Sequence, residues 1–258
     1  MKLKNRLNQL IKDYYQNIYA NFLGLPDFKQ RINQRINEEN DCSHYNSKKN
    51  VEIIEKLINY NFKNKKILVV GAGTGVELIR FHKIKADVYA LEPDDKAFEI
   101  LQIKARINNV PQKKIIKAVA ENIPFKDRSF DFIYCYTVLE HVQDVKNSIR
   151  EMIRVTKAGG YIFIACPDYR YPWEGHYKTY LPLFMPRWIN KIILKLKGRQ
   201  TDFFESLQMV NAKQLKNIFR ENKLMAMQLI QPKTNNQLAS FWQEKLEIEP
   251  NQFWLLKI

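Results

Sequence analysis

The feature that most constrains this chain is a glycine-rich turn between an apolar run and an amphipathic segment. Residues 67–70 read Ile-Leu-Val-Val, which is typical of a buried parallel strand. Gly71, Gly73 and Gly75 follow at alternate positions, and a helix is expected from about residue 75 to residue 84. Glycine adopts backbone conformations closed to other residues and lets a ligand approach the main chain. The sequence therefore predicts a strand, a ligand-binding turn and a helix in succession.

The same alternation of strand and helix continues along the chain. Residues 86–91, 115–119, 130–136 and 161–165 are predicted strands, and helices are expected from Asp94, as N-cap, and over 145–156, ending at Ala158-Gly159-Gly160. After an interruption, a helix over 210–222 and strands over 224–230 and 252–258 follow. This order predicts an α/β fold with a doubly wound, mostly parallel sheet of about seven strands and helices on both faces.

Two segments fall outside that alternation. Residues 1–62 are polar and helical in pattern, with breaks at Gly24-Leu25-Pro26 and at residues 46–50, and predict a helical N-terminal extension to the domain of residues 63–258. Residues 168–205 are crowded with Tyr, Trp, Phe and Pro. Because they follow the fifth strand, and ligands bind beyond the carboxyl ends of parallel strands, we expect a lid insertion over a pocket.

An acidic residue stands at the end of the second predicted strand. Glu92 lies about 20 residues beyond the glycines, where a carboxylate can accept hydrogen bonds from a ribose diol. The alternative is a loop charge that caps the next helix. The glycine turn upstream favours the ligand role.

The spacing and the flanking motifs resemble one family. The turn is Gly-Ala-Gly-Thr-Gly, whereas a dinucleotide pyrophosphate calls for GxGxxG. It resembles motif I of the class I S-adenosylmethionine-dependent methyltransferases. Residues 120–131, 138–142 and 154–160 resemble that family's segments around strands four and five. The resemblance covers residues 66–167 and implies a Rossmann-like fold, a methyltransferase activity, S-adenosyl-L-methionine as cofactor and S-adenosyl-L-homocysteine as product.

The resemblance also implies which residues contact the cofactor. The glycine turn would pack against the amino-acid portion and the ribose, Glu92 would hold the ribose hydroxyls, and the segment before strand four would meet the adenine. Val119 stands where the family often has an Asp that bonds the adenine, so Glu121 or a backbone group would substitute. The expected cofactor contacts are Gly71, Ala72, Gly73, Gly75, Glu92, Pro93, Ala120, Glu121, Cys135 and Tyr136.

Two histidines are candidates for a general base. His176 follows the fifth predicted strand and His141 follows the fourth, so both should lie near the transferred methyl. An imidazole has the pKa to accept a proton from an acceptor hydroxyl near neutral pH. The alternative for each is packing, in a structural loop for His176 and at a helix start for His141.

The acceptor is predicted by what the chain lacks. Residues 135–138 do not form the Asn/Asp-Pro-Pro-Tyr loop of nucleic-acid amino-methyltransferases, and Glu140 is not part of a paired-Glu loop as in protein arginine methyltransferases. O-methylation of a small molecule is therefore expected, such as a natural product, a sugar or a quinone-like compound. Alternatives are N-methylation of a small amine and a methyltransferase-like RNA- or lipid-associated protein. A nicotinamide oxidoreductase is disfavoured, because the glycine turn lacks the spacing that binds a dinucleotide pyrophosphate.

The charge leaves the partner open. The net charge is +15, which suits an acidic partner or a merely solvated basic surface. Residues 186–200 form a basic amphipathic stretch that could touch a membrane surface or serve as a lid helix packed on the core. Cys42, Cys135 and Cys166 are far apart, so no metal and no disulfide is expected. Without a signal-like or spanning segment, a cytoplasmic location is expected. The sequence leaves the oligomeric state open.

Overall fold

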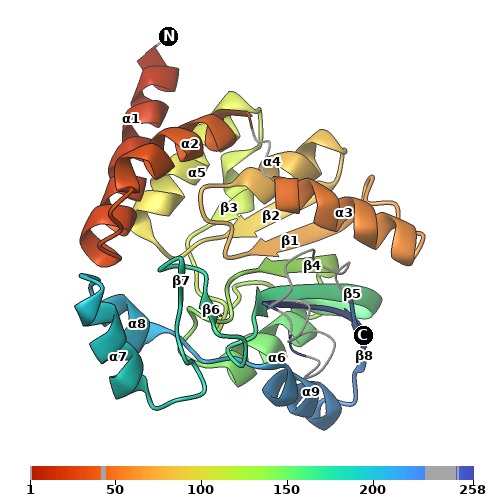
Figure 1. The fold of residues 1–258 in the computed structure, drawn as a ribbon. Coiled ribbons are helices and arrows are strands. Elements are labelled where there is room, and N and C mark those ends of the chain that lie inside the picture. Colours follow the sequence, from red (N-terminus) through yellow and green to blue (C-terminus); the bar gives the residue numbers. More distant parts are fainter. Residues whose placement is uncertain (1, 42–44, 230–247, 249) are drawn as a thin grey trace.

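The computed structural model describes residues 2–41, 45–229, 248 and 250–258, and a seven-stranded sheet forms its centre (Figure 1). The strand order is β3-β2-β1-β4-β5-β9-β8. The strands are β1 (Lys66–Val70), β2 (Asp87–Leu91), β3 (Ile115–Ile116), β4 (Phe130–Tyr136), β5 (Thr156–Pro167), β8 (Met225–Gln228) and β9 (Asn251–Lys257).

The sheet is mostly parallel and its order reverses at β1. Strands β1 to β5 pair in parallel, whereas β9 is antiparallel to both β5 and β8. A chain that winds outward from β1 in both directions leaves a crevice at the carboxyl ends of β1 and β4, where ligands bind in such folds. The predicted fold class, a doubly wound α/β sheet of seven strands with a helical N-terminus, is confirmed.

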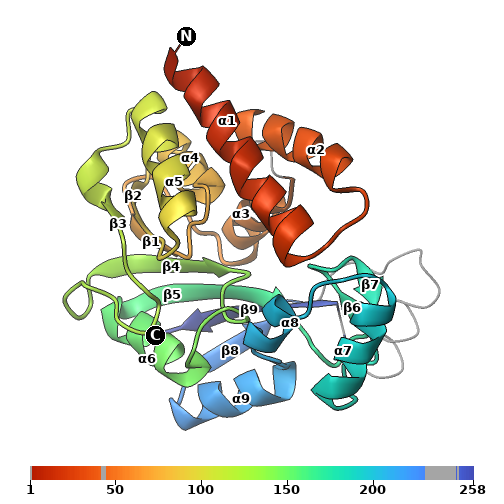
Figure 2. The ribbon, with the colours of Figure 1, turned by 90° about the vertical axis from the view of Figure 1, so that its left-hand side faces the viewer.

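Helices cover both faces of the sheet and bury two apolar cores (Figures 1 and 2). On one face α3 (Tyr45–Leu57), α4 (Val76–Lys83) and α5 (Asp95–Ile107) pack against the sheet. On the other face lie α6 (Val145–Val155) and α9 (Ala212–Glu221). In β1, β4 and β5 successive residues are buried on both faces of the sheet, which explains the continuous apolar runs in the sequence.

Three predicted boundaries are wrong. β3 has two residues instead of the expected five, because Val119 and its neighbours leave the sheet and Val119 is 45% exposed. β5 begins at Thr156 and not at residue 161, since the glycine stop at 158–160 is a bulge in register between Phe130 and Phe132 and not a gap between elements. α3 runs through the polar break expected at residues 46–50. The Asn50 amide there is buried and donates to the Tyr134 hydroxyl at 3.3 Å.

The N-terminal extension and the insertion after β5 pack against each other (Figure 2). The extension contains α1 (Lys2–Gln16), a π-helical turn η1 (Asn17–Phe22) and α2 (Phe28–Asp41). The insertion contains a hairpin of β6 (Trp173–Glu174) and β7 (Thr179–Tyr180), then α7 (Arg187–Leu196) and α8 (Asp202–Ser206). A shared cluster of buried apolar side chains joins them, and it comprises Leu23, Leu25, Tyr169, Tyr177, Leu181, Leu194, Phe204 and Leu207.

A short 3-10 turn, η2 (Gln112–Lys114), precedes β3.

The remaining sequence expectations concern cysteines and membrane segments. Cys135 and Cys166 are buried free thiols, and Cys42 and His44 lie outside the described residues. Within the part of the chain that the structure describes, every helix is too short or too polar to cross a bilayer.

Candidate active site

The glycine turn lies between β1 and α4, beside the end of β2. Gly71, Gly73 and Gly75 have φ values of +63°, +52° and +93°. A Cβ on Gly71 would lie 2.4 Å from a methyl carbon of Val138, so the turn packs tightly against the segment after β4. A Cβ on Gly73 would meet no atom within 4 Å. Gly73 therefore faces open space with a bare backbone, which is the condition for close approach by a ligand.

Glu92 is tied directly to this turn. Its Oε2 accepts a hydrogen bond from the Gly73 backbone N–H at 2.6 Å, and its Oε1 accepts one from the Asp94 N–H at 2.9 Å. The side chain is 6% exposed, and burial raises the pKa of this carboxyl, against the two backbone hydrogen bonds that lower it. Asp94 caps α5 by accepting from the Ala97 N–H, as the sequence predicts. The carboxylate of Glu92 is thus a fixed acceptor at the rim of the turn.

A cavity opens above the glycine turn, at the carboxyl ends of β1 and β4. One wall comes from the turn and from Tyr136 and Thr137 after β4. The opposite wall comes from the N-terminal extension, which contributes Tyr14, Tyr15, Ile18, Arg35 and Glu39. Of the residues expected to contact a cofactor, Gly71, Ala72, Gly73 and Tyr136 line this cavity.

A buried ion pair attaches the extension to the cavity floor. Glu39 of α2 accepts from the Lys104 ammonium at 2.6 Å and from the Thr74 hydroxyl at 2.7 Å, both through Oε2. Its Oε1 accepts from the Tyr15 hydroxyl at 2.7 Å. Burial opposes ionisation of Glu39, but Lys104 and these hydrogen bonds outweigh it and lower the pKa of the carboxyl. The fully partnered carboxylate joins α1, α2, α5 and the glycine turn at one point.

The other expected cofactor residues do not line this cavity, and they are Gly75, Glu92, Pro93, Ala120, Glu121 and Cys135. Cys135 is fully buried, and its side chain belongs to the core on the α6 side of the sheet, so only its backbone can face a ligand near β4. Glu121 accepts from the Gln143 N–H at 2.6 Å, close to the start of α6. Ala120 is buried and Pro93 is exposed. Their proposed adenine and ribose contacts stay predictions.

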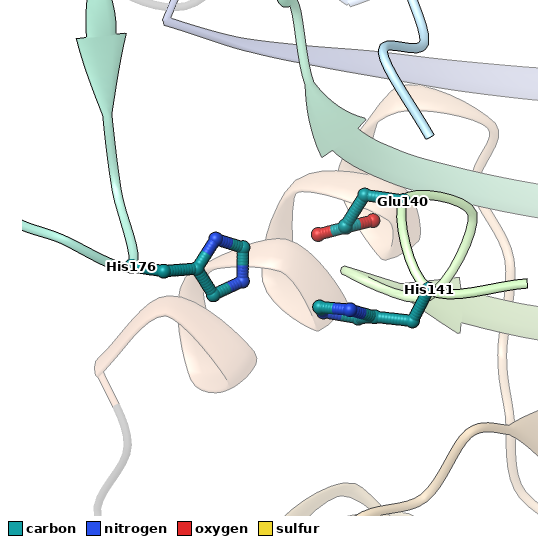
Figure 3. A group of neighbouring side chains, drawn as sticks. All are labelled: Glu140, His141 and His176. Carbon is teal, nitrogen blue, oxygen red and sulfur yellow. The ribbon is translucent and has the colours of Figure 1, made fainter. Parts of the chain in front are cut away.

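The two candidate histidines meet at a second cluster (Figure 3). The rings of His141 and His176 lie 5.1 Å apart, centroid to centroid, nearly perpendicular. Glu140, from the same loop as His141, points toward the ring of His176, which reaches in from the β6–β7 hairpin (Figure 3). Phe203 of α8 covers both rings, with centroids 5.8 Å from His141 and 5.0 Å from His176. The insertion and the segment after β4 therefore build this cluster together.

The charges in this cluster are unevenly partnered. His176 Nδ1 lies 2.8 Å from Oε1 of the buried Glu174, whose Oε2 accepts from the Tyr177 N–H at 2.7 Å. Burial alone would lower the pKa of His176, but Glu174 outweighs it and raises that pKa. Burial raises the pKa of Glu140 to about 7. Burial of the ring lowers the pKa of His141, and the nearby His176 lowers it further, although the residue keeps an exposed face.

Sequence reasoning missed the contribution of the N-terminal extension. Glu39, Tyr14 and Tyr15 stand in polar helices whose pattern says nothing of a ligand. One signal was present: Lys104 interrupts the apolar face of α5 between Ile103 and Ala105, and a charge in that place needs a buried partner. Glu174 was likewise missed, because its role depends on the fold of the hairpin.

Comparison with protein families identifies the central part of the chain. The family model described as "Methyltransferase domain" matches residues 68–164. That range contains the glycine turn, Glu92 and the loop with Glu140 and His141. It excludes the N-terminal extension and the insertion with His176.

Three curated relatives match part of the chain. YcgJ of Bacillus subtilis strain 168, an uncharacterized methyltransferase, is 30% identical over 95 residues, covering 37% of this chain and 38% of that protein. A demethylmenaquinone methyltransferase of Renibacterium salmoninarum is 30% identical over 122 residues, covering 47% and 48%. A ubiquinone biosynthesis O-methyltransferase of Proteus mirabilis is 26% identical over 101 residues, covering 39% and 41%. The chain thus matches less than half the length of these curated relatives.

The fold recurs in solved structures. The crystal structure of the Bacillus subtilis YcgJ protein superposes with a TM-score of 0.54 at 16% identity, over 83% of this chain and 99% of that one. At this identity the similarity concerns the fold.

Proposed function

We propose that this chain, which belongs to the class I S-adenosylmethionine-dependent methyltransferases, transfers a methyl group to an oxygen of a small, quinone-like acceptor. The observation that carries the proposal is the Gly73–Glu92 pair: a bare backbone facing open space beside a fixed carboxylate. A ribose needs such a carboxylate, and the adjoining methionine portion needs a turn without side chains.

The residues present fit S-adenosylmethionine. Glu92 has both oxygens directed by backbone N–H groups, and hydrogen bonds from ribose hydroxyls could use its remaining acceptor capacity. Tyr14, Tyr15 and Tyr136 give the cavity an aromatic lining that would exclude water. When bound, S-adenosylmethionine supplies an electrophilic methyl on a sulfonium, and the enzyme's main task is to hold the acceptor in line with it.

The acceptor's proton needs a recipient. His141 and His176 are our candidates for this role, because a hydroxyl becomes a better nucleophile as its proton leaves. Their rings lie 5.1 Å apart where the loop after β4 meets the β6–β7 hairpin, and neither lines the cavity above the glycine turn. In the transfer, the acceptor oxygen forms a bond to the methyl carbon while the carbon–sulfur bond breaks, and the hydroxyl proton goes to the base.

The surface of α7 favours an acceptor that resides near lipid. Trp188, Ile192 and Leu196 are 63%, 49% and 83% exposed and repeat every fourth residue, so they form one apolar stripe. Lys195 lies beside them, while Arg187 and Lys191 are engaged with α8 through hydrogen bonds and an ion pair. An exposed apolar stripe with basic residues is typical of a helix that lies on a membrane surface, where quinones are found. Two of the relatives are named for a quinone, one as a demethylmenaquinone methyltransferase and one as a ubiquinone biosynthesis O-methyltransferase.

The proposal is tested by product formation. The protein is incubated with S-adenosylmethionine and a panel of hydroxylated quinone precursors, sugars, simple amines and short RNAs, and S-adenosylhomocysteine is measured. We expect turnover with hydroxylated aromatic acceptors, and we expect Gly73→Asn to abolish it. Turnover confined to amines would replace O- by N-methylation, and turnover confined to RNA would overturn the small-molecule acceptor.

A further inference from the structure

The cluster of Glu140, His141 and His176 has a geometry that proton transfer alone does not require. One potential ligand atom of each side chain lies within 4.8 Å of those of the other two. They come from two separate parts of the chain, the loop after β4 and the β6–β7 hairpin, and converge on one point (Figure 3). Ligand atoms at about 2.0–2.2 Å from a metal ion lie up to about 4 Å apart, so a small inward movement would complete a coordination triangle.

His176 is oriented as a metal ligand would be. Its Nδ1 is engaged by Glu174 at 2.8 Å, and Glu174 is itself only 1% exposed and held by the Tyr177 N–H. With Nδ1–H donating to this carboxylate, Nε2 carries a lone pair, and that edge of the ring faces Glu140 and His141 (Figure 3). A buried carboxylate behind a histidine fixes the tautomer and orientation of metal-ligating histidines in general.

Glu140 supplies an independent observation. It is fully buried, yet neither of its carboxylate oxygens has a hydrogen-bond partner among the described residues. A buried carboxylate without partners is costly, and native structures satisfy such groups with a partner, a water or an ion. The side chain points into the space between the two imidazoles (Figure 3), which is where a cation would satisfy it.

We propose that Glu140, His141 and His176 bind one divalent transition-metal ion of the manganese-to-zinc series. Two imidazoles and one carboxylate suit Mn²⁺, Fe²⁺, Co²⁺ or Zn²⁺, whereas Mg²⁺ and Ca²⁺ prefer sites made of oxygen atoms. The sequence predicts no metal, because its cysteines are far apart and His176 stands 35 positions beyond His141.

The ion would keep open positions. Three protein ligands leave at least one coordination site, and the exposed face of His141 places the cluster in contact with solvent. Such an ion would bind the acceptor's hydroxyl oxygen and lower its pKa, so the histidines would hold the ion instead of acting as the base, and the hydroxyl proton would pass to water. This role rests on the proposed methyl transfer, whereas the binding of the ion does not.

The test is metal binding to the full chain without cofactor or acceptor. Metal-free protein is titrated with ZnCl₂ by calorimetry and with CoCl₂ by visible absorption, which reports the ligand field. We expect one ion per chain, at least about 100-fold weaker binding in Glu140→Gln, His141→Ala and His176→Ala, and about 10- to 100-fold weaker binding in Glu174→Gln, which removes no ligand. His82→Ala, a histidine of α4 outside the cluster, is the matched control and should bind like the wild type.

Thermal unfolding of each metal-free variant keeps the result interpretable. A ligand variant that unfolds at the wild-type temperature and loses the ion supports the site, and Glu174→Gln provides a second route if one does not fold. Absence of one-to-one binding by the wild type would overturn the proposal, and so would equal affinity in the ligand variants and in His82→Ala. Neither titration uses S-adenosylmethionine, so a failure of the metal-binding proposal is distinguishable from a failure of the proposed methyl transfer.

Discussion

The backbone N–H of Gly73 donates a 2.6 Å hydrogen bond to Oε2 of Glu92, so the glycine turn after β1 and the acidic end of β2 form one unit. The two residues are 19 positions apart in sequence. A second contact reinforces the unit, since the Ala72 N–H donates to the Leu91 carbonyl at 2.8 Å. The carboxylate that would hold a ribose is therefore set by the same backbone that leaves room for the methionine portion.

Replacement of Glu92 tests the carboxylate. Hydrogen bonds to charged groups are worth about 1.5–3 kcal/mol, so Glu92→Ala should weaken S-adenosylhomocysteine binding by at least about tenfold. Calorimetric titration measures this, with thermal unfolding to verify that the domain stays folded. Asp95→Asn, an acidic residue of the first turn of α5, is the control and should bind normally. An unchanged dissociation constant in Glu92→Ala would make Glu92 a mere loop charge.

The buried pair of Glu39 and Lys104 should dominate attachment of the extension. Both side chains are almost fully buried, and Glu39→Gln leaves the Lys104 charge without its partner. We expect a loss of about 3–5 kcal/mol in unfolding free energy, measured in urea. Glu38→Gln, which breaks a more exposed pair with Arg35, should cost about 1 kcal/mol or less. Adding Lys104→Met to Glu39→Gln should restore much of the loss. Equal stability of the two single variants would contradict a structural role for the pair.

The same carboxylate predicts a pH dependence. The folded-state pKa of Glu39 lies below its ordinary value of about 4.3, so its contribution to stability is fully present above that pH. As the pH falls through the folded-state pKa, Glu39 is protonated and the contribution is lost. The difference in unfolding free energy between the wild type and Glu39→Gln should thus be constant from pH 7 to 5 and shrink toward pH 3. A gap that persists unchanged at pH 3 would refute this.

The sequence identified the sheet and the glycine turn, because their signals are local. Apolar runs, the alternating glycines of residues 71–75 and the Asp94 cap each report on their own neighbours in sequence. The parts of the site that come from the N-terminal extension and from the insertion after β5 could not be predicted from local patterns. Glu39 meets Thr74 across 35 positions and Glu140 faces His176 across 36, and such contacts arise only when the extension and the insertion fold over the sheet.

Removal of the apolar stripe on α7 should weaken membrane contact. Trp188→Ala combined with Leu196→Ala removes two exposed side chains, each worth about 1.5–3 kcal/mol when buried. Cosedimentation with vesicles that contain anionic lipid should fall by more than about tenfold, and wild-type binding should decrease with added salt. Phe22→Ala with Met225→Ala, two exposed apolar residues elsewhere, serves as control. If the wild-type protein does not cosediment with the vesicles, the surface of α7 no longer supports a lipid-borne acceptor.

Cofactor binding by a variant of Gly73 decides whether the cavity is a methyltransferase site. Asn tolerates positive φ, and a Cβ at Gly73 would meet no protein atom within 4 Å, so Gly73→Asn should fold while filling the ligand's space. Gly159→Asn is the matched control, since Gly159 also has positive φ and an open Cβ but lies in the β5 bulge. Calorimetry with S-adenosylmethionine should give a dissociation constant on the order of micromolar for the wild type and for Gly159→Asn, and no binding for Gly73→Asn. Full binding by Gly73→Asn, or none by the wild type, would contradict the assignment.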